Sequence, residues 1–119
     1  MSAHVEPLRL VLLAEEPEWA ALLRARLETL GGAFPLITAP NWEAASSLFD
    51  DGGHGLLLTT PACQPAPGRC SLPTILLLDE EPVVEPADVC DWLVRDNLGV
   101  DLLRRCLRYA SAVSYTHLT

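Results

Sequence analysis

Apolar residues in this chain gather in short runs that are separated by polar turns. The first stretch, LRLVLLAEEPEWAALLRARLETLGG, begins with a run from Leu8 to Ala14 that is long enough for a buried strand and too short to span a membrane. An acidic pair and Pro17 follow, and proline suits the first turn of a helix. Apolar side chains then recur at helical spacing up to Gly31, a typical capping residue. The pattern predicts a strand, an acidic turn and an amphipathic helix.

The same alternation of strand and helix patterns continues with shorter elements. Asn41 is a good helix N-cap, and apolar residues follow it at helical spacing up to Phe49. Further strands are predicted at Ala33 to Ala39, Gly55 to Thr60, Thr74 to Asp79 and Asp91 to Arg95, and a last helix at Val100 to Ala110.

Two connections are poor helix formers. The segment from Pro61 to Leu72 contains three prolines and a glycine, so it cannot hold a helix of useful length. The acidic segment from Glu80 to Val89 carries two prolines and allows a turn or two at most. The whole order of elements predicts an α/β fold, with a doubly wound parallel sheet of five strands.

Composition narrows the function classes. The 119 residues suffice for one domain, half of them are hydrophobic, and the net charge is −8. All eight basic residues are arginines, and an acidic chain repels nucleic acid and anionic membranes. The start of the chain lacks a signal-peptide pattern, so we expect a cytoplasmic protein. The four cysteines have no C-x-x-C spacing and are expected to be free thiols, and a metal site of Cys63, Cys70 and His54 is disfavoured.

The last seven residues, Val113 to Thr119, do not belong to the predicted fold. They spell VSYTHLT, which a DNA string resembling a transposon end used in sequencing libraries would encode. We therefore expect a domain over residues 1–112 and a non-native scar over 113–119.

Two pieces, LRLVLLAEEPEWAALLRARLE and DWLVRDNLGVDLLRRCLRYA, resemble the receiver domain of bacterial two-component response regulators. The resemblance runs over nearly all of Leu8 to Ala110. It implies a flavodoxin-like fold in which the proline-rich loop replaces the third helix and the fourth helix is shortened. It also implies the N-terminal part of a larger cytoplasmic signalling protein.

Active receivers use two acids and an aspartate to hold Mg²⁺, and that aspartate accepts a phosphoryl group from a histidine kinase. Of this pattern the chain keeps the acidic pair, Glu15 and Glu16. The resemblance puts Thr60 at the phosphoacceptor position, where a hydroxyl is a poor nucleophile at neutral pH.

The other phosphoryl-binding positions also depart from the active pattern. Leu78, or Asp79 in a shifted register, stands at the Thr/Ser position, and Arg95 stands at the lysine position. We interpret the chain as a degenerate receiver, a pseudo-receiver without enzymatic activity. It would need no cofactor, with at most weak Mg²⁺ binding at Glu15 and Glu16.

A pseudo-receiver would signal through protein–protein contacts that do not depend on phosphorylation. The resemblance implies a partner surface on the last strand and helix, used by a homodimer or by the chain's own downstream domain. The charged residues expected on this interaction face are Asp91, Asp96, Asp101, Arg104, Arg105 and Arg108.

Two other functions stay open from the sequence. In the first, Glu15, Glu16 and Asp79 form a displaced acidic pocket that binds Mg²⁺ or keeps phosphoryl chemistry. In the second, the chain is a small Rossmann-like ligand-binding domain, although no G-x-G-x-x-G motif follows any strand. The simplest expectation for single residues is that Thr60 bonds to backbone and that Arg95 pairs with a neighbouring carboxylate.

Overall fold

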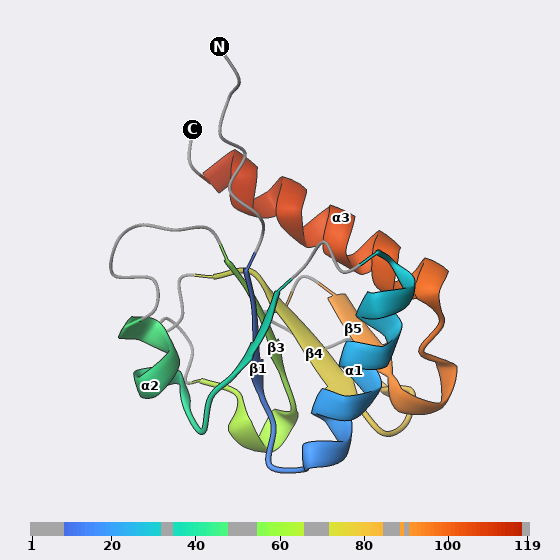
Figure 1. The fold of residues 1–119 in the computed structure, drawn as a ribbon, viewed down its shortest axis with the longest axis horizontal. Helices are drawn as coiled ribbons and strands as arrows, with labels where there is room; N and C mark the ends of the chain where they lie inside the picture. Colours follow the sequence, from blue (N-terminus) through green and yellow to red (C-terminus); the bar gives the residue numbers. More distant parts are fainter. Residues whose placement is uncertain are drawn as a thin grey trace.

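A five-stranded parallel sheet forms the centre of the computed structural model (Figure 1). The structure describes residues 9–31, 35–47, 55–65, 72–84, 89 and 91–117, with side chains of the last segment described up to residue 109. The strands are β1 (Arg9–Leu13), β2 (Leu36–Thr38), β3 (Gly55–Thr59), β4 (Thr74–Leu78) and β5 (Asp91–Val94). Their order in the sheet, β2-β1-β3-β4-β5, confirms the predicted flavodoxin-like arrangement.

Within the described ranges, three α-helices accompany the sheet. They are α1 (Pro17–Thr29), α2 (Trp42–Ser46) and α3 (Val100–His117). Pro17 occupies the first turn of α1, as predicted. Asn41 caps α2, because its side-chain oxygen accepts a hydrogen bond of 2.8 Å from the backbone N–H of Ala44.

Alternate residues of each strand point to opposite faces of the sheet, and both faces are covered. Leu10 and Leu12 of β1 pack in the core beneath α1 and α3, whereas Val11 and Leu13 pack in the core on the α2 side. Burial on both sides explains why β1, β3 and β4 are continuous apolar runs in the sequence. Each fully buried leucine contributes about 2 kcal/mol of hydrophobic stabilisation.

The two connections that were predicted to be poor in helix contain no α-helix in their described parts. After β3 there is a single 3₁₀ turn, Pro61–Cys63, and after β4 residues 79–84 contain no helix. The remaining parts of these connections, residues 66–71, 85–88 and 90, lie outside the described residues. The described connections therefore agree with a missing third helix and a shortened fourth one.

The predicted end of the last helix is wrong. We expected it at Ala110, but α3 continues to His117. Neither glycine nor proline occurs between Val100 and His117, so no residue in that segment breaks the helix. The assignment of residues 113–119 to a non-native scar stays a prediction, since their side chains lie outside the description.

Within the described residues, no helix combines the length and the apolar character needed to cross a bilayer.

Candidate functional site

The candidate site lies where four parallel strands end at the same edge of the sheet. Glu15 and Glu16 follow β1, Thr60 follows β3, Asp79 follows β4 and Arg95 follows β5. The strand register aligns these ends, since Leu13 lies beside Thr59 and Leu78 lies beside Val94. Ligands of doubly wound sheets bind at this edge, so the fold brings the predicted residues to the expected place.

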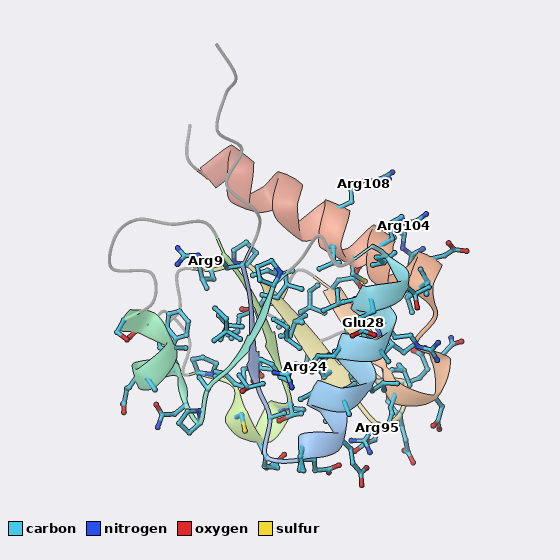
Figure 2. The ribbon with its side chains drawn as sticks, viewed as in Figure 1. Arg9, Arg24, Glu28, Arg95, Arg104 and Arg108 are labelled. Carbon is cyan, nitrogen blue, oxygen red and sulfur yellow. The ribbon has the colours of Figure 1, made fainter. Side chains whose placement is uncertain are left out.

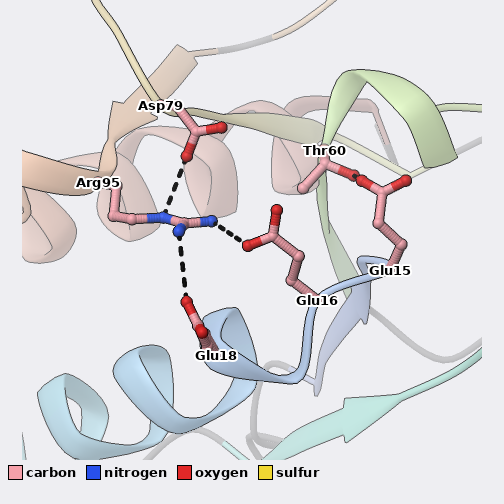
Figure 3. Close-up of polar contacts among 6 residues, drawn as sticks. All are labelled: Glu15, Glu16, Glu18, Thr60, Asp79 and Arg95. Carbon is pink, nitrogen blue, oxygen red and sulfur yellow. Dashed lines mark hydrogen bonds and ion pairs between the residues drawn. The ribbon is translucent and has the colours of Figure 1, made fainter.

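Thr60 is held on both its backbone and its side chain. It is 6% exposed, and its N–H donates to the carbonyl of Leu13 at 3.2 Å. Its hydroxyl Oγ1 donates to Oε1 of Glu15 at 3.3 Å (Figure 3). Thr60 is thus hydrogen-bonded to backbone through its N–H, as expected, whereas its hydroxyl bonds to a side chain; the hydroxyl of the neighbouring Thr59 donates to the carbonyl of Thr60 at 3.0 Å. The hydroxyl of Thr60 reaches a side chain because Thr60 lies past the strand end, directly opposite the acidic turn.

Arg95 lies among three carboxylates, two from the start of α1 and one from the connection after β4 (Figure 3). Its Nη2 donates to Oε2 of Glu16 at 2.8 Å, and its Nη1 lies 3.6 Å from Oε2 of Glu18. Its Nε lies 3.1 Å from Oδ1 of Asp79, an ion pair that lacks hydrogen-bond geometry. These contacts confirm that Arg95 pairs with neighbouring carboxylates.

The guanidinium of Arg95 also contacts an aromatic ring. The Cζ atom of Arg95 lies 4.6 Å from the ring centroid of Trp19, a residue that is 2% exposed. Such a cation–π contact adds about 0.5–1 kcal/mol. The Arg95 side chain is 27% exposed, whereas Glu18 is 79% exposed, so the pair with Glu16 is the better shielded one.

The surroundings keep Arg95 charged. Its pKa is raised above the ordinary arginine value, first by the hydrogen bond to Glu16 and then by the charges of Asp79, Glu16 and Glu18. Partial loss of solvent acts in the opposite direction. Arg95 therefore supplies a permanent positive charge at this edge of the sheet.

These residues do not fit a divalent metal ion. Glu15 accepts the hydroxyl of Thr60, while Glu16 and Asp79 are paired with the guanidinium of Arg95. In the part of the chain that is described, no group of three His, Cys, Asp or Glu side chains is arranged to hold a metal. The neutral hydroxyl of Thr60 supplies none of the negative charge that a carboxylate ligand would bring to a divalent cation. Cys70 and His54, the other disfavoured ligands, lie outside the described residues.

Leu78 offers no polar group to the site. It is the last residue of β4, partly buried, and it pairs with Val94 in the sheet. The Thr/Ser position of the resemblance is therefore apolar in that register, and the shifted position holds Asp79, which Arg95 contacts.

Most residues of the predicted interaction face lie on the outside of the last elements. Arg104 and Arg108 extend from α3 into solvent (Figure 2), and Arg105 is exposed as well. The two exposed acids, Asp96 and Asp101, lie in the 3₁₀ turn after β5 and in the first turn of α3.

Asp91 lies apart from this group. Its carboxylate accepts a hydrogen bond of 2.8 Å from the N–H of Trp92 and one of 3.3 Å from the buried thiol of Cys106. Burial first, and then the Asp91 charge, raise the pKa of Cys106 to about 12. Asp91 therefore links β5 to the buried side of α3 through the hydrogen bond from Cys106. Residue spacing in the sequence did not indicate this role.

A groove of about 340 Å³ lies beside the site, between the start of α1 and the neighbouring ends of β1 and β2. Its lining is mostly apolar or small, with two charged side chains, Glu16 and Arg24. The groove is partly open to solvent, and one of its two charged side chains, Glu16, is already bonded to Arg95.

Comparison with known proteins supports the fold. No family model and no curated protein matches the sequence. The structure is similar to a crystal structure described as a "putative response regulator from Chloroflexus aurantiacus J-10-fl", with a TM-score of 0.67 and 15% sequence identity. The match covers 89% of this chain and 99% of that one. At this identity the likeness shows a receiver-like fold.

Proposed function

We propose that this domain is a pseudo-receiver, a signalling module that acts by protein–protein contact and does not depend on phosphorylation. The proposal includes a cytoplasmic, bacterial protein whose further domains receive the signal. The receiver-like fold supports the signalling class. The residues at the carboxyl edge of the sheet support the loss of phosphoryl transfer.

The observation that carries the proposal is the environment of Thr60. A threonine hydroxyl needs an adjacent base before it attacks phosphorus, and the adjacent group is Glu15 at 3.3 Å. That carboxylate would repel an incoming phosphoryl dianion unless a metal neutralised it. The other carboxylates of the site are paired with Arg95, so they favour no metal.

Partner contact is proposed through the outer side of α3. Arg104, Arg105 and Arg108 are exposed there, and Asp96 and Asp101 lie near the start of the same helix. Opposite charges on one surface allow cross-pairing in a homodimer or with the chain's own downstream domain. Nucleic acid and membranes are disfavoured as partners because the net charge is −8.

The test is incubation of the purified protein with acetyl phosphate and Mg²⁺, followed by mass spectrometry of the intact chain. We expect no added phosphoryl group on the wild type. A phosphoryl adduct that disappears in Thr60→Ala or Asp79→Asn would overturn the proposal. An active receiver treated in parallel verifies the reagent.

The alternative with a displaced acidic pocket has less support. It requires Asp79 to face a metal together with Glu15 and Glu16, but Arg95 lies 3.1 Å from Asp79 and 2.8 Å from Glu16. The alternative of a Rossmann-like ligand binder rests on the groove beside α1, which is partly open to solvent.

A further inference from the structure

Negative charge exceeds positive charge at the carboxyl edge of the sheet. In the described part of the site, the carboxylates of Glu16, Glu18 and Asp79 lie around one guanidinium, and a fourth carboxylate, that of Glu15, accepts a hydrogen bond from Thr60. Carboxylates that share a site repel each other unless a cation lies between them. The side chain that lies between three of them is Arg95 (Figure 3).

We propose that Arg95 is an internal counter-cation, which takes the place of a bound divalent metal and excludes one from the pocket. The inference rests on the proposed function, and it adds a specific cause for the lack of a metal-dependent state. The protein would then respond to divalent cations only when Arg95 is removed.

The geometry suits arginine and not lysine. Three nitrogens of one planar group contact three carboxylates: Nη2 reaches Glu16, Nη1 reaches Glu18 and Nε reaches Asp79. A guanidinium presents its donors in a rigid fork, whereas an ammonium is a compact point charge. The guanidinium also lies over the ring of Trp19, a contact that a planar cation makes well.

The contacts tie together elements that are far apart in the chain. Glu16 and Glu18 belong to the start of α1, Asp79 follows β4, and Arg95 begins the short connection from β5 to α3. The pair with Glu16 spans 79 positions of the sequence. We therefore expect the connection between β5 and α3 to be fixed in one arrangement whatever the divalent cation concentration.

A metal entering this pocket has to displace a cation that is already bound. Removing the guanidinium leaves carboxylates from the β1–α1 turn and from the end of β4 without a counter-charge. Clustered carboxylate oxygens are the ligands that Mg²⁺ and Mn²⁺ prefer. Loss of Arg95 should therefore turn a pocket that holds its own cation into one that binds a cation from solution.

The experiment measures Mn²⁺ binding by the electron paramagnetic resonance signal of free Mn²⁺, at constant ionic strength. The proteins are the wild type, Arg95→Met, Arg95→Lys and the control Arg104→Met, which removes the same charge from an exposed site on α3. Circular dichroism verifies that each variant is folded.

We expect no saturable binding by the wild type or the control, and affinity at least about tenfold higher in Arg95→Met. Glu16→Gln added to Arg95→Met should abolish the gain. Arg95→Lys should bind Mn²⁺ with intermediate affinity. If Arg95→Met does not fold, the comparison of Arg95→Lys with the wild type provides the test. Amide exchange at residues 96–99 should be faster in Arg95→Met and unchanged in the control.

Either of two results would overturn the inference: wild-type binding as tight as that of Arg95→Met, or folded Arg95 variants that gain no affinity. These outcomes are separate from the acetyl phosphate test. A wild type that binds Mn²⁺ and still takes no phosphoryl group would reject the counter-cation while leaving the pseudo-receiver intact.

Discussion

Replacing Thr60 by aspartate should destabilise the domain at neutral pH. The change places a carboxylate at the position that we propose to correspond to a receiver's phosphoacceptor, but it does so beside an existing carboxylate. The hydroxyl of Thr60 now donates to Glu15 at 3.3 Å, and this favourable contact would become a contact between two anions. We therefore expect a restored nucleophile to weaken the fold unless a metal binds.

The magnitude follows from the separation and the exposure of the two groups. Two unit charges about 4 Å apart interact with about 4 kcal/mol at the effective dielectric of a protein surface and about 1 kcal/mol in bulk water. Thr60 is buried and Glu15 is exposed, so an intermediate value of about 2 kcal/mol is expected.

The assay is urea unfolding of Thr60→Asp and of the uncharged match Thr60→Asn, followed by circular dichroism. At pH 7 the aspartate variant should be less stable than the asparagine variant by about 2 kcal/mol. Repulsion favours a proton on one of the two carboxyl groups in the folded state, so the difference should shrink as the pH falls to about 4.5. Equal stability of the two variants at pH 7 would refute this reasoning.

Two further predictions concern α3. Burial and Asp91 raise the pKa of Cys106 to about 12 from a value of 9.0 for an unburied thiol. The unfolded state therefore loses this proton first, and the free energy of unfolding should fall as the pH rises from 9.0 to about 12. Cys106→Ala should remove this pH dependence in urea unfolding. Below pH 9.0 both states keep the proton and the thiol contributes no pH dependence. Deleting residues 113–119 should change stability by less than about 0.5 kcal/mol, whereas Leu103→Ala, in the core, should cost about 2–5 kcal/mol. A deletion as costly as Leu103→Ala would show that the tail packs against the domain.

Local sequence predicts most of the fold because local chemistry decides most of it. The apolar run of β1 has to be buried on both faces, Pro17 starts α1, and Asn41 caps α2 by a hydrogen bond within one turn. The end of α3 was misjudged, since the apolar spacing weakens after Ala110 while no glycine or proline interrupts the helix before His117.

The site could be predicted only in part. Strand ends indicate which residues meet at the carboxyl edge, and they brought Arg95 close to acids, as expected. Strand ends do not indicate which acids contact Arg95, because that depends on how far each side chain reaches across the sheet. Glu18 and Trp19 were therefore missed as partners of Arg95, although their position in the first turn of α1, directly after the acidic pair and Pro17, is a usable signal. The same limit explains why the thiol of Cys106 was not matched with Asp91.

Thr60 and Arg95, the two residues on which the proposed function depends, compensate each other. With a carboxylate at position 60, Glu15 would face a like charge. Arg95 would not neutralise this pair of charges, because it is already paired with Glu16 and Asp79. With threonine there, the hydroxyl donates to Glu15, and one guanidinium is enough for the remaining acids of the turn. An arginine in place of lysine is then favourable, because its fork satisfies carboxylates that a metal would otherwise hold. Three acids of the pocket therefore share the pocket's own cation, and a carboxylate at position 60 alone should add a negative charge that Arg95 does not balance.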